Sequence, residues 1–121
     1  MSDLKVRMYT LKTCSTCRKA VKWLKERGVE VEQLPVRESP PDRESLASWM
    51  TSDNLKPYLN TSSKDYRSRG LSGRQLTLDE ALDEIEACPN LIKRPLTVWG
   101  DEADFGFKEA RFEERLAALM G

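Results

Sequence analysis

The chain has 121 residues, 39% of them hydrophobic and 33% charged, which fits one ordinary globular domain over residues 1–121. Its 20 basic and 20 acidic residues cancel, so overall charge gives no reason to expect direct nucleic-acid binding and leaves only a local patch. The chain contains no histidine, which excludes Ser-His-Asp catalysis, Cys-His catalysis and any zinc site that uses histidine.

The start of the chain, residues 1–12, has no apolar run followed by a small-residue cleavage site. No stretch approaches the roughly 18 apolar residues of a membrane span. We therefore expect a cytoplasmic protein with no membrane association. Two of the three cysteines form a CxxC motif, and without a secretion signal such a motif is typical of redox chemistry rather than of a structural disulfide.

The first third of the chain predicts a βαβ unit. Residues 4–10 alternate between apolar and polar side chains, which indicates a half-buried strand. Residues 15–27 have the spacing of an amphipathic helix, and Gly28 is expected to follow its last residue. Alternation resumes at about residue 29 and continues to about residue 36. The apolar face of the helix consists of Cys17, Ala20, Val21 and Leu24.

The middle of the chain predicts helices and loops. Residues 39–42 are typical of a helix start, with Ser39 as N-cap and proline in the first turn. The inner face of that helix is expected to carry Leu46, Trp49 and Met50. Residues 54–73 are rich in polar side chains and predict short helical turns and loop. Three side chains of this stretch are interpreted as solvated surface: Tyr66, Arg67 and Arg69.

A second helix of this region begins with a predicted capping box at residues 77–80. Its apolar stripe consists of Leu78, Ala81, Leu82, Ile85 and Cys88. Pro89 should end the helix. Because Cys88 lies on the stripe, we interpret it as a buried structural residue.

The last third predicts a β-hairpin and a helix. Residues 96–99 form a short strand, Gly100-Asp101 a turn, and a second strand runs to about residue 107. The final helix, residues 109–120, is expected to bury Phe112, Leu116 and Leu119. The order βαβ, helices, ββα predicts an α/β thioredoxin-like fold with a helical insertion between its two halves.

The CxxC motif carries the candidate chemistry. The thiolate is the nucleophilic form of cysteine, and helix N-termini and nearby cations stabilise it. Cys14 follows a strand at the mouth of a helix, and Lys12, Arg18 and Lys19 add positive charge. Cys17 lies about one helical turn further on, so its sulfur can reach that of Cys14. The pair predicts a reversible disulfide in which Cys14 attacks and Cys17 resolves.

Two structural interpretations stay open beside the redox one. The CxxC motif has the spacing of half a zinc site, but Cys88 is the only further cysteine, so no metal is predicted. Alternatively Cys17 is only a core residue on the apolar helix face, which leaves Cys14 as a lone nucleophile.

The dipeptide Arg94-Pro95 precedes the predicted third strand. A cis-proline at that point would bring backbone close to the cysteines. Arg94 could hold an oxyanion beside the thiolate with its forked donors. The other interpretation, an ordinary surface arginine before an edge-strand proline, is equally compatible with the residues.

Four segments of the chain form a recognisable set: YTLKTCSTCRKA at residues 9–20, NTSS with YR at residues 60–67, LIKRPL at residues 91–96 and GFKE at residues 106–109. Together they resemble the arsenate reductase-like (ArsC/Spx) family, most closely its small, poorly characterised members with a CxxC motif. The resemblance covers nearly the whole chain. It implies a thioredoxin fold with a helical insertion, Cys14 as nucleophile, Pro95 as cis-proline and Arg94 as an anion-binding arginine.

The resemblance also implies two functions. The first is a thiol-dependent reductase with no bound cofactor, which acts on a small oxyanion or a thiol/disulfide substrate and is reduced by glutathione or thioredoxin. Two further arginines of the family's anion site are replaced here, at about Asn60 and around Phe107, and each charged contact is worth roughly 1.5–3 kcal/mol, so weak arsenate binding is expected. The second is a redox-sensing transcriptional regulator of the Spx type that binds the RNA polymerase α subunit. A plain thioredoxin-like disulfide reductase has less support, because Ser15-Thr16 replaces the usual Gly-Pro environment.

Overall fold

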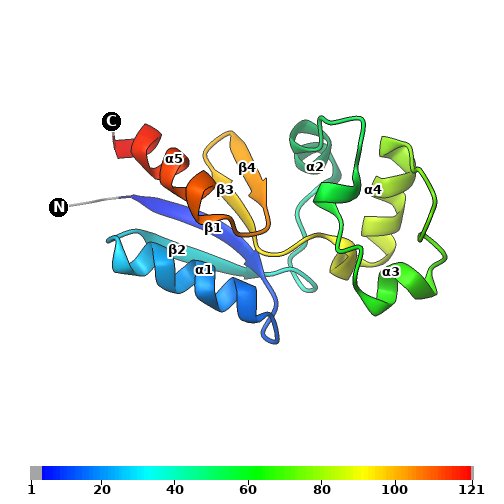
Figure 1. Ribbon diagram of the computed structural model, residues 1–121, viewed down its shortest axis with the longest axis horizontal. Coiled ribbons are helices and arrows are strands. Elements are labelled where there is room, and N and C mark those ends of the chain that lie inside the picture. The colour runs from blue at the N-terminus through cyan, green and yellow to red at the C-terminus, as the bar shows by residue number, and fades with distance from the viewer. Residues whose placement is uncertain (1–3, 121) are drawn as a thin grey trace. The chain divides into compact units, whose positions relative to one another are not determined.

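The computed structural model describes residues 4–120, which divide into two compact units. The first unit combines the chain through Pro35 with the chain from Arg94 onward, and the second is Val36–Lys93. The second unit is thus inserted between the two halves of the first, which confirms the predicted helical insertion (Figure 1). That residues 1–121 act as one domain stays a prediction.

The first unit contains a four-stranded mixed sheet in the order β2-β1-β3-β4. Strand β1 (Lys5–Thr10) pairs in parallel with β2 (Glu30–Pro35) and antiparallel with β3 (Leu96–Trp99). Strand β4 (Glu102–Phe105) pairs antiparallel with β3 and ends two residues earlier than predicted. The turn between β3 and β4 requires Gly100, whose φ of 76° is in the left-handed region that glycine adopts without a steric penalty.

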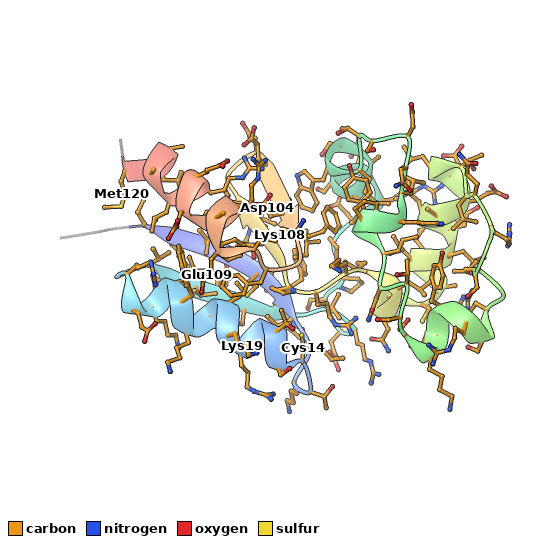
Figure 2. All side chains as sticks on the ribbon, viewed as in Figure 1. Cys14, Lys19, Asp104, Lys108, Glu109 and Met120 are labelled. Atoms are coloured by element: carbon orange, nitrogen blue, oxygen red, sulfur yellow. The ribbon has the colours of Figure 1, made fainter. Side chains whose placement is uncertain are left out.

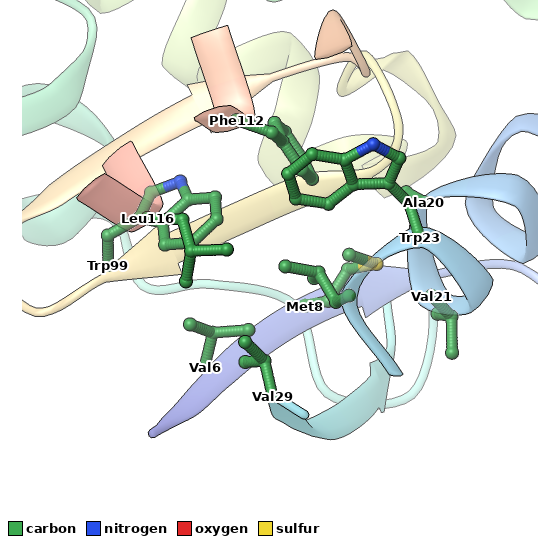
Figure 3. Close-up of a cluster of buried hydrophobic side chains, with 10 residues drawn as sticks. Val6, Met8, Ala20, Val21, Trp23, Val29, Trp99, Phe112 and Leu116 are labelled. Carbon is green, nitrogen blue, oxygen red and sulfur yellow. The ribbon is translucent and has the colours of Figure 1, made fainter. Parts of the chain in front are cut away.

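Two helices, α1 (Ser15–Glu26) and α5 (Glu109–Met120), pack on one face of this sheet. Val6 and Met8 of β1 point to the same side and meet Trp23 of α1 and Phe112 of α5 in a buried cluster (Figure 3). The fully buried Phe112 ring has its centre 5.1 Å from the ring of Trp99 and contacts it edge to face. This cluster fixes the position of α1, and therefore of the CxxC motif, on the sheet.

The apolar periodicity of α5 extends one turn further than its burial. Phe112 and Leu116 are buried as predicted, but Leu119 is 44% exposed. Leu119 lies in the last turn of the helix, beyond the buried cluster, so the helical spacing was right and the prediction of burial was wrong.

The second unit is made of short helices, as the sequence predicts. They are α2 (Arg43–Trp49), η1 (Lys56–Tyr58), α3 (Lys64–Ser68), α4 (Leu78–Ala87) and η2 (Pro89–Leu91). The predicted capping box of α4 is present: Glu80 N–H donates to Thr77 Oγ1, and Thr77 N–H donates to the Glu80 carboxylate. Arg43 of α2 forms ion pairs with three α4 carboxylates, those of Asp79, Asp83 and Glu86.

Three predictions for this unit were wrong. The N-cap of α2 is Asp42 rather than Ser39. With Ser39 as N-cap, Pro40 would have to be helical, but Pro41 follows it and a residue before proline is disfavoured in helical conformation. Tyr66 is only 4% exposed and belongs to the core. Cys88 is half-buried at the C-cap of α4, where the chain leaves the helix, and so falls off the buried stripe.

Candidate active site

Cys14 is the N-cap of α1, in extended conformation directly after the loop from β1. Its Sγ accepts the backbone N–H of Cys17 at 3.2 Å, and its own N–H donates to the Leu11 carbonyl at 3.0 Å. Figure 2 shows Cys14 at the N-terminal end of α1. The sulfur therefore lies where the unpaired N–H groups and the positive end of the helix dipole stabilise negative charge.

Cys17 has a different environment in the first turn of the same helix. It is 2% exposed, whereas Cys14 is half-exposed. Burial, a hydrogen bond to Cys14 and the charge of Cys14 raise the pKa of Cys17 to about 12, against the lowering effects of the Leu11 backbone and the Arg94 guanidinium. Cys17 is therefore a protonated thiol at neutral pH, and its side chain is hydrogen-bonded to that of Cys14. The two cysteines form no disulfide in this structure.

Strand pairing brings Arg94 and Pro95 to the same end of the sheet as the cysteines. Strands β1 and β3 are antiparallel and Tyr9 pairs with Leu96, so the end of β1 lies beside the start of β3. The Arg94–Pro95 peptide bond is cis, and the Pro95 carbonyl accepts the Gly106 N–H at 2.8 Å. Arg94 is half-buried, and its charge acts on Cys17. The structure thus brings Cys14, Cys17 and Arg94 together.

The other two predicted anion-binding residues lie at the rim of this site. Lys12 and Arg18 are exposed, and Arg18 Nη1 donates to the Lys12 carbonyl at 3.0 Å. That bond closes the loop before α1 against the first turn of the helix. Lys12 and Arg18 contribute positive charge near Cys14, while Arg94 contributes it from the segment that precedes β3.

Two features near the site were not predicted. Thr97 follows Pro95 by two residues and is fully buried, and its hydroxyl has no hydrogen-bond partner among residues 4–120. A surface hollow of about 430 Å³ lies along α1 and reaches Gln33 of β2. Its lining consists of Arg18, Val21, Lys22, Lys25, Glu26 and Gln33. Neither feature has a sequence motif, since both depend on which strand lies beside which helix.

Within residues 4–120, no group of three or more histidine, cysteine, aspartate or glutamate side chains could hold a metal ion. In the same part of the chain, no helix has the length and apolar character needed to cross a membrane.

A mixed sheet in the order β2-β1-β3-β4, with two helices on one face and a cysteine pair opening α1, defines a protein of the thioredoxin fold. Within that class the comparison with family models is specific. The model of the ArsC family matches residues 9–115, nearly the whole chain, and the chain belongs to this family.

Relatives in the family differ in their described roles. The chain is 40% identical to the uncharacterized protein YusI of Bacillus subtilis over 113 residues, which cover 90% of this chain and 96% of YusI. It is 28% identical to the global transcriptional regulator Spx of Enterococcus faecalis, with 84% of this chain and 79% of Spx covered. A crystal structure of a possible arsenate reductase from Streptococcus mutans has 31% identity and a TM-score of 0.80, with 90% of this chain and 96% of that chain covered.

Proposed function

We propose that the protein is a thiol–disulfide oxidoreductase of the ArsC family, with Cys14 as nucleophile and Cys17 as resolving thiol. The observation that carries the proposal is the contrast between the two sulfurs. Cys14 is accessible and accepts an N–H at the start of a helix, whereas Cys17 is buried beside it and protonated. A nucleophile and a reserve thiol in contact are what a two-step reduction needs.

In the first step the Cys14 thiolate attacks one sulfur of a substrate disulfide. The Cys14–substrate S–S bond forms, the substrate S–S bond breaks, and the first substrate thiolate leaves. In the second step the Cys17 sulfur attacks Cys14 Sγ. The Cys14–Cys17 disulfide forms, and the second substrate sulfur leaves with the proton that Cys17 gives up. Glutathione or thioredoxin then supplies the two electrons that restore both thiols, in the reducing cytoplasm.

The positive groups have separate roles in this proposal. Arg94 stabilises negative charge on either sulfur from the β3 side, in agreement with its effect on the pKa of Cys17. Lys12 and Arg18 attract an anionic substrate to the exposed side. A small oxyanion is a second substrate class for the same thiolate. We expect arsenate to be a poor substrate, because Asn60 and Phe107 provide none of the positive charge that the family's arginines supply.

The test is a reaction of the reduced protein with 2,2′-dithiodipyridine followed by mass spectrometry. We expect Cys14→Ser to lower the rate of thiopyridone release by at least about 100-fold, and Cys17→Ser to accumulate the Cys14 mixed disulfide. Cys88→Ser is the matched control and should react like the wild type. A Cys14→Ser variant that keeps the full rate would refute the proposal.

A second candidate function is a redox switch in transcription, which the similarity to Spx favours. In this reading oxidation of Cys14 and Cys17 changes a surface that binds the RNA polymerase α subunit. A pull-down with purified α subunit, performed on the reduced and the oxidised protein, distinguishes the two functions. Retention in only one redox state supports the switch, and retention in neither removes it.

A further inference from the structure

The exposed side of α1 carries an excess of positive charge. The helix contains four basic residues and one acidic residue, Glu26, in its last position. The protein as a whole is neutral, with 20 residues of each sign, so this excess is a local property of the helix. Because the helix also contains the nucleophile Cys14 as its N-cap, the charge lies beside the reacting sulfur.

Three of the four cations line up with Cys14. Arg18, Lys22 and Lys25 follow Cys14 by four, eight and eleven residues, which places them within one arc of the helix. We call these three residues the basic stripe. At about 1.5 Å per residue the stripe extends roughly 16 Å from Cys14 along the helix axis. All three side chains are exposed.

The basic stripe borders the hollow of about 430 Å³ that reaches Gln33 on β2. All three cations of the stripe line this hollow, together with the aliphatic Val21. The lining therefore combines three positive charges with one carboxylate, that of Glu26 at the far end, an apolar floor and one amide. Such a surface fits carboxylate side chains, whose oxygens take charge-assisted hydrogen bonds while their methylene groups contact the floor.

We propose that the basic stripe and its hollow dock an acidic segment of a protein that delivers a cysteine sulfur to Cys14. The proposal rests on the thiol chemistry proposed above and names the chemistry of its macromolecular partner. A segment of about five extended residues spans the stripe, so carboxylates two to five positions from the partner's cysteine reach its cations. Docking holds the partner's sulfur against Cys14 and raises the effective concentration of the reacting groups.

Nucleic acid fits this surface less well than an acidic protein does. A phosphate backbone needs a long positive track, whereas the stripe ends at Glu26, whose carboxylate also lines the hollow. A carboxylate-bearing segment of limited length can end before this negative group. The charge pattern therefore selects a short acidic segment.

The test compares peptides of equal length that each carry one cysteine blocked as its 2-thiopyridyl disulfide. The flanking residues on both sides are glutamate, glutamine or lysine. Attack by Cys14 forms the Cys14–peptide disulfide, breaks the peptide–thiopyridyl bond and releases thiopyridone, which is followed by absorbance. At low ionic strength we expect the glutamate peptide to react about tenfold faster than the glutamine peptide, and the lysine peptide more slowly. In about 1 M salt, where the Debye length is about 3 Å, the rates should converge.

Matched variants locate the effect. Lys22→Gln with Lys25→Gln should bring the ratio of glutamate to glutamine rates below about two. Lys64→Gln with Lys93→Gln removes the same charge from two exposed lysines elsewhere in the chain and should leave that ratio unchanged. All forms should react alike with neutral 2,2′-dithiodipyridine, because neither lysine pair belongs to the proposed catalytic group.

The outcomes separate the two proposals. If the neutral reagent fails to react, the proposed function falls and the docking proposal falls with it. If the neutral reagent reacts but the glutamate peptide gains no advantage, or keeps it in the Lys22/Lys25 variant, docking alone is refuted. Stronger inhibition by a twelve-nucleotide oligothymidylate than by a cysteine-free glutamate peptide would assign the surface to nucleic acid instead. If the wild type forms a dimer in solution and the Lys22/Lys25 variant is a monomer, the surface is a contact between two copies of this chain.

Discussion

Raising the pH should accelerate the step in which Cys17 attacks the mixed disulfide on Cys14. In the reduced protein the pKa of Cys17 is about 12, raised first by burial and then by its hydrogen bond to Cys14 and the charge of Cys14. In the mixed disulfide Cys14 carries no charge, so the last two effects weaken while burial stays. We therefore expect a pKa between the ordinary 9.0 and about 12 in this intermediate. Below that pKa the reactive thiolate, and hence the rate, increases about tenfold per pH unit.

The assay isolates this step by a pH jump. At about pH 4 the protein is labelled on Cys14 with 2,2′-dithiodipyridine, and the excess reagent is removed. At this pH the attack of the Cys17 thiol on the labelled Cys14 is slow, so the mixed disulfide persists. A jump to a series of higher pH values starts the attack by Cys17, which releases the second thiopyridone. Cys17→Ser is the control and should release none. The logarithm of the rate is expected to rise with unit slope from about pH 6.5 and to level off only above about pH 9.

An Arg94→Met variant tests the positive charge that opposes the rise in the pKa of Cys17. The Arg94 guanidinium lowers the pKa of Cys17, so its removal should move the levelling-off point to higher pH and slow the step several-fold at neutral pH. A wild-type rate that levels off below about pH 8 would refute the reasoning, because it would mean that Cys17 is not desolvated when it attacks.

The remaining predictions concern stability. The folded protein holds the pKa of Cys17 above its ordinary 9.0, so the protonated thiol contributes stability that is complete below about pH 9 and is lost between pH 9 and 12. Over that range the free energy of unfolding of the reduced wild type should fall by up to about 4 kcal/mol relative to that of Cys17→Ala, measured by urea unfolding at each pH. Phe112→Ala should cost about 3–5 kcal/mol at any salt concentration, measured in the same assay, and a cost below about 1 kcal/mol would contradict the packing described for the fully buried ring. Asp104→Ala should cost about 1–3 kcal/mol, less in high salt, since its carboxylate accepts from Arg111 and Arg115; a cost that salt leaves unchanged would contradict an ionic origin.

Local patterns were enough to predict most elements of the fold. The bounds of β3 and α5 agree with the sequence prediction. For β3 the reason is that its pattern is short and sharply bounded, by Pro95 before the strand and by the turn at Gly100 after it. The errors concern burial. Tyr66 lies in a polar stretch and its burial depends on residues distant in sequence, while Leu119 has the right helical spacing but lies beyond the buried cluster. Periodicity specifies which face of a helix is apolar, but not how far the neighbouring layer extends.

The candidate site was predictable where its residues are close in sequence. The spacing of Cys14 and Cys17 after a strand was sufficient to place them at a helix start. The contribution of Arg94 needed the antiparallel pairing of β1 with β3, which no local pattern encodes, and before the structure was known an ordinary surface arginine was an equal alternative. The hollow beside α1 could not be predicted, since Gln33 reaches it only through the parallel pairing of β2 with β1.

The burial of Cys17 also limits how the oxidised protein can be reduced. With Cys17 shielded, an external thiolate attacks the exposed Cys14 sulfur, and Cys17 must then leave as a thiolate. Burial keeps the pKa of Cys17 above its ordinary 9.0 in this state too, and such a thiol is a poor leaving group, because leaving groups of lower pKa depart faster. For the proposed oxidoreductase we therefore expect a dilute monothiol to reduce the pair slowly, and a reductant that docks on the proposed basic stripe to compensate through its effective concentration. For the proposed redox switch the same slow step would prolong the oxidised state, so adding a docking reductant should shorten the lifetime of that state.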